Sequence, residues 1–304
     1  MKLIKPSFSI LPQSDGLEGI YRQIEMAGRT CYKSEDKITE TSAKEFVDRM
    51  IKSGHGAMLE HGTVYLQYEM VKGCTHPLDK YYHNKYSVVH TINGITGDTK
   101  KVFVTTNLRV LVEKGWLDDL KYVCEPTEHH ERRYTVKFIC DRGVSHEFVR
   151  HRVFSFAQES TRYCNYSKDK FGNEVTFIIP EWFDLKEGHC VYKDALVENG
   201  TLKEQGGFYI DDLYIGNEWG GEIWAFLWTL QHCEHYYFSL INKGWKPQQA
   251  RAVLPNSLKT ELVMTGFVSD WKHFFELRDA KSAHPQALEL ASPLHQEFLT
   301  RGYL

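Results

Sequence analysis

The sequence predicts an α+β protein in which helices flank a mainly antiparallel β-sheet. Two periodicities support this class. Apolar residues recur at helical spacing over residues 41–54 and 219–243, whereas residues 63–70 and 134–141 alternate between apolar and polar side chains, as half-buried strands do. Helices and strands of these kinds pack in layers around a common core. We predict a single domain over residues 1–304.

The composition is that of a globular protein with a sizeable core. Of 304 residues 42% are hydrophobic, the formal net charge is −3 and the pI is near 6.6. This balance gives no general attraction to a nucleic-acid polymer or an anionic membrane, so any anion site must be local. Seven cysteines without a C-x-x-C pair favour a reducing compartment. Because the chain shows neither an apolar run of membrane-spanning length nor a signal peptide, we expect a cytoplasmic protein.

The first seventy residues are predicted to form a strand over 3–11, a helix over 17–26 that ends at a turn at 29–31, the helix over 41–54 and the strand over 63–70. The second helix has serine or threonine at its start and glycine at its end. Its apolar side chains recur at i, i+3, i+4, i+7 and i+8, at Ala43, Phe46, Val47, Met50 and Ile51.

The middle of the chain holds a predicted hairpin at 91–98 and a short apolar element of uncertain type over 102–113. After the strand at 134–141, Ser145 can cap a helix that runs into Arg150.

The long helix over 219–243 carries an aromatic stripe, which is typical of a core. Part of this stripe can also serve as a contact between subunits. Pro247 opens a helix that delivers Arg251. A strand over 258–267, a helix over 271–278 that Ser269 caps and a last helix from His284 complete the prediction.

Arginines gather around one stretch, in which Arg150-His151-Arg152 is followed after seven residues by Ser160-Thr161-Arg162-Tyr163. Guanidinium groups grip a phosphate or a pyrimidine carbonyl by paired hydrogen bonds, whereas lysine offers only a point charge. We predict a site for a small anion with planar polar groups. The alternative is a solvated basic helix end that complements the helix dipole.

The helical geometry limits how this stretch can act. Successive helical residues point about 100° apart, so Arg150, His151 and Arg152 cannot all face one ligand unless the helix unwinds or two ligands lie on different sides. Ser160 with His151 as its base would suggest a nucleophile. However, no Gly-x-Ser-x-Gly turn surrounds the serine and no acid is evident to orient the imidazole, so we interpret Ser160 as an anion-binding hydroxyl.

His55, Glu60 and His61 could suggest a metal site, but their spacing is not H-E-x-x-H and no helix would place all three on one face. We predict no metal.

The pattern of Arg150-His151-Arg152, seven residues, Ser160 and then Arg162-Tyr163 resembles the hallmark of the flavin-dependent thymidylate synthases. Other segments are similar to family segments in the same order: 27–32, 54–61, 250–255, 274–278 and His284 with Gln286. The stretches at about 71–133 and 170–215 are interpreted as insertions.

The resemblance implies reductive methylation of dUMP to dTMP without an enzyme nucleophile. Methylenetetrahydrofolate would donate the carbon, and NADPH would reduce the FAD that supplies hydride. The implied assembly is a homotetramer with composite sites.

The resemblance also implies residue roles. The residues that would hold dUMP are Glu147, Arg150, Gln158, Ser160, Thr161, Arg162, Arg251 and Arg278. Of these, Arg150, Ser160 and Arg278 would be catalytic, with Arg251 on phosphate and Arg278 on the pyrimidine. The residues that would hold flavin or folate are His55, Glu60, Arg150, His151, Arg152, His273 and His284.

One departure concerns the flavin. Many relatives have Asn and Arg where this chain has Phe267 and Ser269, and Asn where it has His273. Two alternatives therefore stay open: a nucleotide-binding relative that has lost flavin and turnover, and an RNA-binding protein, which the acidic balance disfavours.

Overall fold

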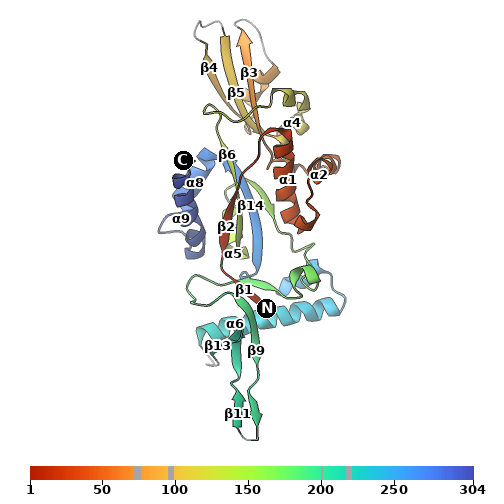
Figure 1. Ribbon diagram of the computed structural model, residues 1–304, viewed down its shortest axis with the longest axis vertical. Helices are drawn as coiled ribbons and strands as arrows, with labels where there is room; N and C mark the ends of the chain where they lie inside the picture. Colours follow the sequence, from red (N-terminus) through yellow and green to blue (C-terminus); the bar gives the residue numbers. More distant parts are fainter. Residues whose placement is uncertain (72–76, 95–98, 200, 217–220) are drawn as a thin grey trace.

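The computed structural model describes residues 1–71, 77–94, 99–199, 201–216 and 221–304. The molecule is elongated, with its sheets following one another along the long axis and its helices beside or across them (Figure 1). Apart from β1 (Lys2–Ile4) with β8 (Thr176–Ile178), every described strand pair is antiparallel, which confirms the predicted mainly antiparallel α+β class. Among the described residues, no helix is both long and apolar enough to cross a bilayer.

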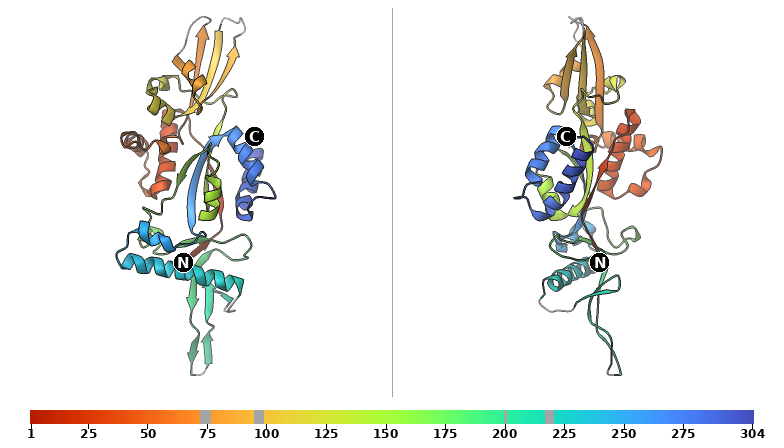
Figure 2. Two further views of the ribbon diagram at one scale, coloured as in Figure 1. Left: turned by 180° about the vertical axis from the view of Figure 1, so that it is seen from behind. Right: turned by 60° about the vertical axis from the view of Figure 1, so that its left-hand side comes forward.

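A four-stranded central sheet has the order β2-β6-β14-β7. Its strands are β2 (Ser7–Leu11), β6 (Arg133–Asp141), β14 (Lys259–Phe267) and β7 (Ser155–Gln158). Helices cover both of its faces, α1 and α2 on one and α8 and α9 on the other (Figure 2). Each face therefore has its own core.

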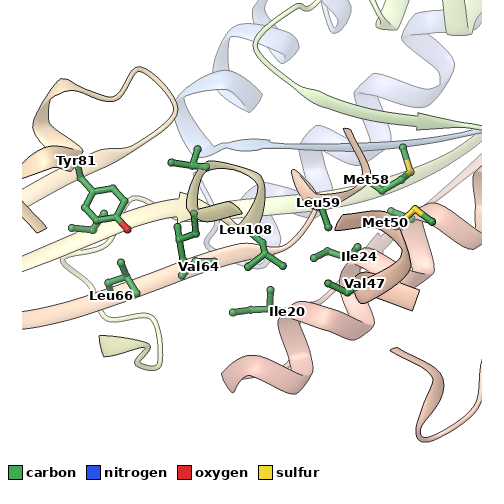
Figure 3. Packing of buried hydrophobic residues seen from close by; sticks show 14 of the residues in the cluster. Ile20, Ile24, Val47, Met50, Met58, Leu59, Val64, Leu66, Tyr81 and Leu108 are labelled. Carbon is green, nitrogen blue, oxygen red and sulfur yellow. The ribbon is translucent and has the colours of Figure 1, made fainter. Parts of the chain in front are cut away.

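The first face carries α1 (Gly16–Tyr32), α2 (Ser42–Lys52) and the short α3 (Gly56–Leu59). Figure 3 shows Ile20 and Ile24 of α1 beside Val47 and Met50 of α2 and side chains of the neighbouring sheet. The predicted apolar positions of α2 are those that pack here. This core continues into the sheet at one end of the molecule.

That end sheet has the order β3-β5-β4, from β3 (Thr63–Val71), β5 (Thr99–Asn107) and β4 (Val88–Asn93). Helix α4 (Leu108–Lys114) follows β5, so the apolar element of uncertain type is half strand and half helix. β4 pairs with β5 up to Asn93 opposite Lys100, as a hairpin requires, while 95–98 lie outside the described residues. Two 3-10 helices flank this sheet, Pro77–His83 and Leu117–Tyr122.

The second face of the central sheet carries α5 (Arg142–Phe148), α8 (Val268–Arg278) and α9 (Pro285–Thr300). Trp271 and Phe274 of α8 are fully buried there, against Phe138 and Phe148.

The opposite end of the molecule is a five-stranded sheet, β13-β12-β9-β1-β8, crossed by α6 (Glu222–Asn242) (Figure 1). Its further strands are β9 (Gly188–Lys193), β12 (Gly207–Ile210) and β13 (Leu213–Gly216), and a two-stranded arm of β10 (Leu196–Glu198) and β11 (Thr201–Glu204) extends from it. The remaining elements are α7 (Pro247–Ala250) and the 3-10 helices Glu35–Lys37, Asp169–Phe171 and Arg251–Val253.

Four predicted boundaries are wrong. The strand at 3–11 is two strands in different sheets, separated at Pro6, which has no N–H to give to a ladder. The turn at 29–31 belongs to α1, which continues to Tyr32 and ends because Lys33 adopts the left-handed conformation, with φ 48°.

The other two errors concern helix starts. Asp141, not Ser145, caps α5, because its carboxylate accepts a hydrogen bond from the Val144 N–H at 2.7 Å. Helix α8 begins at Val268, before Ser269, and the Asp270 carboxylate accepts from the Phe267 N–H at 2.9 Å.

Candidate functional site

One group of predicted residues lies where α5 ends against α8. We call it the Arg278 cluster: Glu147, Arg150, His151, Arg152, His273 and Arg278. Arg278 is the last residue of α8, and its guanidinium donates to the Glu147 carboxylate at 2.6 Å and to the Glu147 carbonyl at 2.9 Å. Its Nε donates to the His151 imidazole at 3.0 Å. All of its nitrogens therefore have protein partners.

His151 acts here as a neutral acceptor. Its ring is 7% exposed and lies 5.1 Å from the Phe274 ring. Burial first, and then the positive charge of Arg278, lowers the pKa of His151 to about 4. The imidazole therefore stays uncharged at neutral pH, which suits an acceptor beside a guanidinium.

The unwinding of α5 places the arginines on one cavity. The helix ends at Phe148, so Arg150, His151 and Arg152 follow in a turn instead of projecting 100° apart. With His273 and Arg278 they line a cavity of about 470 Å³. Arg150 and Arg152 are exposed. Such a cavity can hold an anionic or carbonyl-rich ligand against three guanidinium groups.

The second group lies just beyond β7, and we call residues Ser160–Tyr163 the Ser160 segment. The Ser160 N–H donates to the Cys31 carbonyl of α1 at 3.0 Å, and its hydroxyl accepts from the Arg162 N–H at 3.3 Å. Arg251 donates to the buried Thr161 hydroxyl at 2.8 Å. The Arg162 guanidinium is exposed and lies 5.7 Å from the Tyr163 ring centre.

Gln158, the last residue of β7, is turned inward. Its amide donates to the Ser145 hydroxyl at 2.8 Å and to Thr260 at 3.3 Å. Ser145 thus serves as a partner for Gln158 instead of a helix cap.

His55 joins the Ser160 segment through α1. Its Nδ1 is 3.2 Å from the Tyr32 hydroxyl, and the Tyr32 ring meets the Tyr163 ring edge-on at 5.5 Å between centres. Glu60 does not join them, because its carboxylate pairs with Arg109. His284 lies apart as well, beside the Trp182 ring at 6.3 Å.

The two groups contact different helices. The Arg278 cluster contacts Phe274 of α8, whereas the Ser160 segment is bonded to α1. The cavity of the Arg278 cluster contains no residue of the Ser160 segment. One subunit therefore does not bring all the predicted residues into one cavity.

The sequence reasoning missed two features. A buried network of charged residues lies behind the Ser160 segment: Lys33, Lys137, Glu159, Lys259 and Glu261. Arg133 was also missed. Its guanidinium lies 5.3 Å from the Phe267 ring centre and donates to the Glu60 carbonyl and Thr63. Alternating charges inside an apolar strand, as at Lys259 and Glu261, were the available signal.

No metal centre is found among the described residues, where His, Cys, Asp and Glu form no group of three suited to a metal. His61 is fully buried, and its Nδ1 is 2.8 Å from the Thr265 hydroxyl. Burial lowers the pKa of His61 to about 3.

Comparison with known families decides the membership. Residues 116–300 match the family described as thymidylate synthase complementing protein. The chain belongs to this family. The match includes the Arg278 cluster and the Ser160 segment, and it confirms the resemblance found in the sequence.

Two relatives illustrate the range of similarity within this family. The chain is 27% identical over 165 residues to the flavin-dependent thymidylate synthase of Pyrococcus furiosus, covering 53% of this chain and 52% of the relative. It is 23% identical over 272 residues to that of Corynebacterium aurimucosum, covering 88% and 71%. The chain thus spans about half the length of the Pyrococcus relative and more of the Corynebacterium one.

A solved structure, the UMP/dUMP methylase PolB of Streptomyces cacaoi bound with 5-Br dUMP, is 17% identical. The superposition covers 100% of this chain and 93% of the PolB chain, with a TM-score of 0.40. That score is too low for the likeness to support an argument.

Proposed function

We propose that this protein converts dUMP to dTMP by reductive methylation, with methylenetetrahydrofolate as carbon donor. The observation that carries the proposal is the cavity where Arg150, Arg152 and Arg278 converge, in a chain that belongs to the thymidylate synthase complementing family. The names of the relatives, flavin-dependent thymidylate synthases, support the same reaction.

The nucleotide would be held by both groups. Arg162 and Arg251, with the Ser160 and Thr161 hydroxyls, suit the phosphate, because Arg251 is hydrogen-bonded to Thr161 and so adds a second guanidinium group beside the Ser160 segment. Arg278, Arg150, Glu147 and Gln158 suit the pyrimidine. A guanidinium at a ring carbonyl stabilises the negative charge that develops there when the ring is reduced.

The site would be composite, built from more than one subunit. The cavity of the Arg278 cluster has no residue of the Ser160 segment in its lining, so the Ser160 segment of a second copy would complete it. A homotetramer provides such shared sites. Closed symmetry of this kind is common among soluble oligomers.

The residues present fit a flavin. Arg150 and Arg152 are exposed and line the cavity of the Arg278 cluster, where their guanidinium groups can donate to the carbonyl or phosphate oxygens of such a cofactor. The Arg133 guanidinium beside Phe267 already donates to the Glu60 carbonyl, Thr63 and Ser155, so it is not counted among the flavin contacts. We assign the flavin and folate contacts to His55, Glu60, Arg150, His151, Arg152, His273 and His284, of which His55, Glu60 and His284 lie outside the cavity of the Arg278 cluster in the same subunit. FAD held there would contribute the hydride chemistry, with NADPH as its reductant.

Ser160 has an anchoring role in this proposal. Its hydroxyl accepts the Arg162 N–H, and no hydrogen bond joins it to His151, which is bonded to Arg278. It therefore lacks the base that would make it a nucleophile. The protein's part is to position the reactants and to place positive charge at the pyrimidine.

The decisive experiment is an absorption spectrum of the purified protein with added FAD, with and without dUMP. We expect flavin bands that change when dUMP is added. A colourless protein that takes up no FAD yet binds dUMP would replace the proposal with a nucleotide-binding relative without turnover, which the loss of polar groups at Phe267 and Ser269 would then explain. A protein that binds neither would refute both.

A further inference from the structure

A second cavity, of about 650 Å³, lies behind the Ser160 segment. Its walls come from the C-terminal end of α1, the start of β14 and the 3-10 helix Asp169–Phe171. Its lining includes Lys33, Glu159, Tyr166, Lys170, Phe171 and Lys259. None of them has a role in the proposed reaction.

One wall is fixed by buried ion pairs. The Glu261 carboxylate accepts from Lys33 at 2.5 Å, from Lys259 at 2.6 Å and from Lys137 at 2.7 Å. Lys259 also donates to Oε2 of Glu159 at 2.8 Å. Broken pairs of this kind would leave a buried charge uncompensated, so the wall is held in one arrangement.

These groups stay charged at neutral pH. Burial opposes the charge on Lys33, but the Glu261 carboxylate outweighs it and raises the pKa of Lys33 to about 12. Burial likewise opposes the charge on Glu261, but Lys259 and Lys33 hold the pKa of Glu261 well below its usual range.

Two polar atoms on the cavity wall have no hydrogen-bond partner. They are Oε1 of Glu159, which is 2% exposed, and the hydroxyl of Tyr166, which is 5% exposed. Burial and then the nearby Glu159 carboxylate raise the pKa of Tyr166, so its hydroxyl remains a donor. A buried carboxylate oxygen and a buried phenol without partners are costly unless something in the cavity satisfies them.

We propose that this cavity binds a neutral pyrimidine base or nucleoside. The ring edge of uracil or thymine places an N–H beside a carbonyl, and these groups match the Glu159 oxygen as acceptor and the Tyr166 hydroxyl as donor. The Phe171 ring, 5.3 Å from the Tyr166 ring centre, gives an aromatic wall. The cavity volume lies within the range of small-molecule sites, roughly 300–1,000 Å³.

The charges of the lining favour a neutral ligand. Four lysines (Lys2, Lys33, Lys170 and Lys259) face four carboxylates (Glu35, Asp36, Glu159 and Glu174). Lys33 and Lys259 are already paired, and Lys170 donates to the Lys33 carbonyl at 2.9 Å. A phosphate would meet the Glu159 carboxylate without a free arginine fork to offset the repulsion.

This site adjoins the proposed nucleotide site. Glu159 directly precedes Ser160, and Tyr166 follows Tyr163 by three residues, so a bound base would contact residues on both sides of the Ser160 segment in the sequence. An effect of that ligand on dUMP affinity would rest on the proposed function. Binding in the cavity does not.

Thymidine is the probe, because it carries the thymine edge but no phosphate for Arg162 to bind. Crystals of the full chain are soaked with thymidine, and its affinity is measured in solution by calorimetry. We expect density for the base between Glu159 and Tyr166, and an affinity that falls by about tenfold in Tyr166→Phe. Because the deleted hydroxyl has no protein partner, Tyr166→Phe should keep the wild-type melting temperature, so the loss cannot be attributed to unfolding.

Arg162→Ala separates this inference from the proposed function. This variant should weaken the affinity for dUMP and leave the affinity for thymidine unchanged. Thymidine affinity that falls in Arg162→Ala but not in Tyr166→Phe would place the nucleoside in the dUMP site and overturn the second site. Density for water only in the cavity would overturn it as well, whether or not the protein binds dUMP.

Discussion

The Arg278 cluster and the Ser160 segment both contain arginines, but in the part of the chain that the structure describes Arg278 is bonded to protein groups and Arg162 is not paired with a carboxylate. Arg278 is fully engaged by Glu147 and His151, whereas Arg162 is exposed and has no ion-pair partner among the described residues. An engaged guanidinium is held in one geometry, and a ligand there must share or replace an existing partner. An unengaged guanidinium can take an anion without such an exchange.

This difference suits the two arginines to different parts of a nucleotide. A phosphate, with its full charge, is best met by the free fork of Arg162. A neutral pyrimidine carbonyl needs a fork whose orientation is already fixed, which Glu147 and His151 provide for Arg278. The comparison therefore predicts that Arg162 governs dUMP affinity, whereas Arg278 governs the orientation of the pyrimidine and the stability of the fold.

The largest expected effect is on binding. Arg162→Ala should weaken the affinity for dUMP by about 10- to 100-fold, because charge-assisted hydrogen bonds to the phosphate are lost. The melting temperature should not change, since Arg162 stabilises no neighbour by an ion pair. Calorimetric titration with dUMP measures the loss. The matched control is Arg301→Ala, which removes another exposed arginine, from a pair with Glu297. Equal affinity in the two variants would remove the phosphate assignment.

Arg278→Ala should lower the stability of the fold, which Arg162→Ala should leave unchanged. It leaves the partly buried Glu147 carboxylate without its cation, so the free energy of unfolding should fall by about 2 kcal/mol. Urea unfolding followed by circular dichroism measures it. A stability equal to that of Arg162→Ala would show that the two arginines are in the same state, against the comparison. Glu147→Gln, which keeps an acceptor for Arg278, should lose less than Arg278→Ala.

Acid should break the Arg278 cluster before the Ser160 segment. The folded pKa of His151, about 4, lies below its unfolded value near 6.5, so the unfolded chain binds more protons between these values. This contribution is complete above pH 6.5 and is lost as the pH falls towards 4, at most about 3 kcal/mol for a shift of this size. His151→Gln should flatten the stability profile in that window. His61, with a pKa of about 3, contributes over an overlapping range and would remain. An unchanged profile in His151→Gln would show that the imidazole is not held neutral.

The sequence was informative where a pattern has one physical meaning. The helix over 41–54 and the strand over 134–141 were predicted within two residues, because a periodic apolar face has to be buried. Membership of the family was predicted from the spacing between Arg150 and Tyr163.

Other features depend on which side of a sheet a segment meets. The two groups were expected to converge on one ligand, within a subunit or across neighbouring subunits, and nothing in their spacing shows that residues 160–163 stay outside the cavity of the Arg278 cluster. Lys259 and Glu261 would be read as a solvent face from their alternation, yet Glu261 is 5% exposed because β14 is covered on both sides. The end of α1 at Lys33 was missed because lysine rarely adopts a positive φ.

The smallest expected effect concerns Arg251 and the Ser160 segment, and it distinguishes a role in dUMP affinity from a role in stability. Thr161→Val keeps the shape of a buried side chain but removes the hydroxyl that accepts from Arg251. Arg251 is exposed, so water can replace that partner and the fold should lose less than about 1 kcal/mol. The loss should appear instead as a few-fold weaker dUMP affinity, because the fork of Arg251 is no longer oriented. Thr300→Val, at an exposed helical hydroxyl bonded to the Gln296 carbonyl, is the control and should change neither quantity. If Thr161→Val loses stability but no affinity, Arg251 stabilises the segment instead of the phosphate, and Arg162 is then the principal anion contact on this side of the sheet.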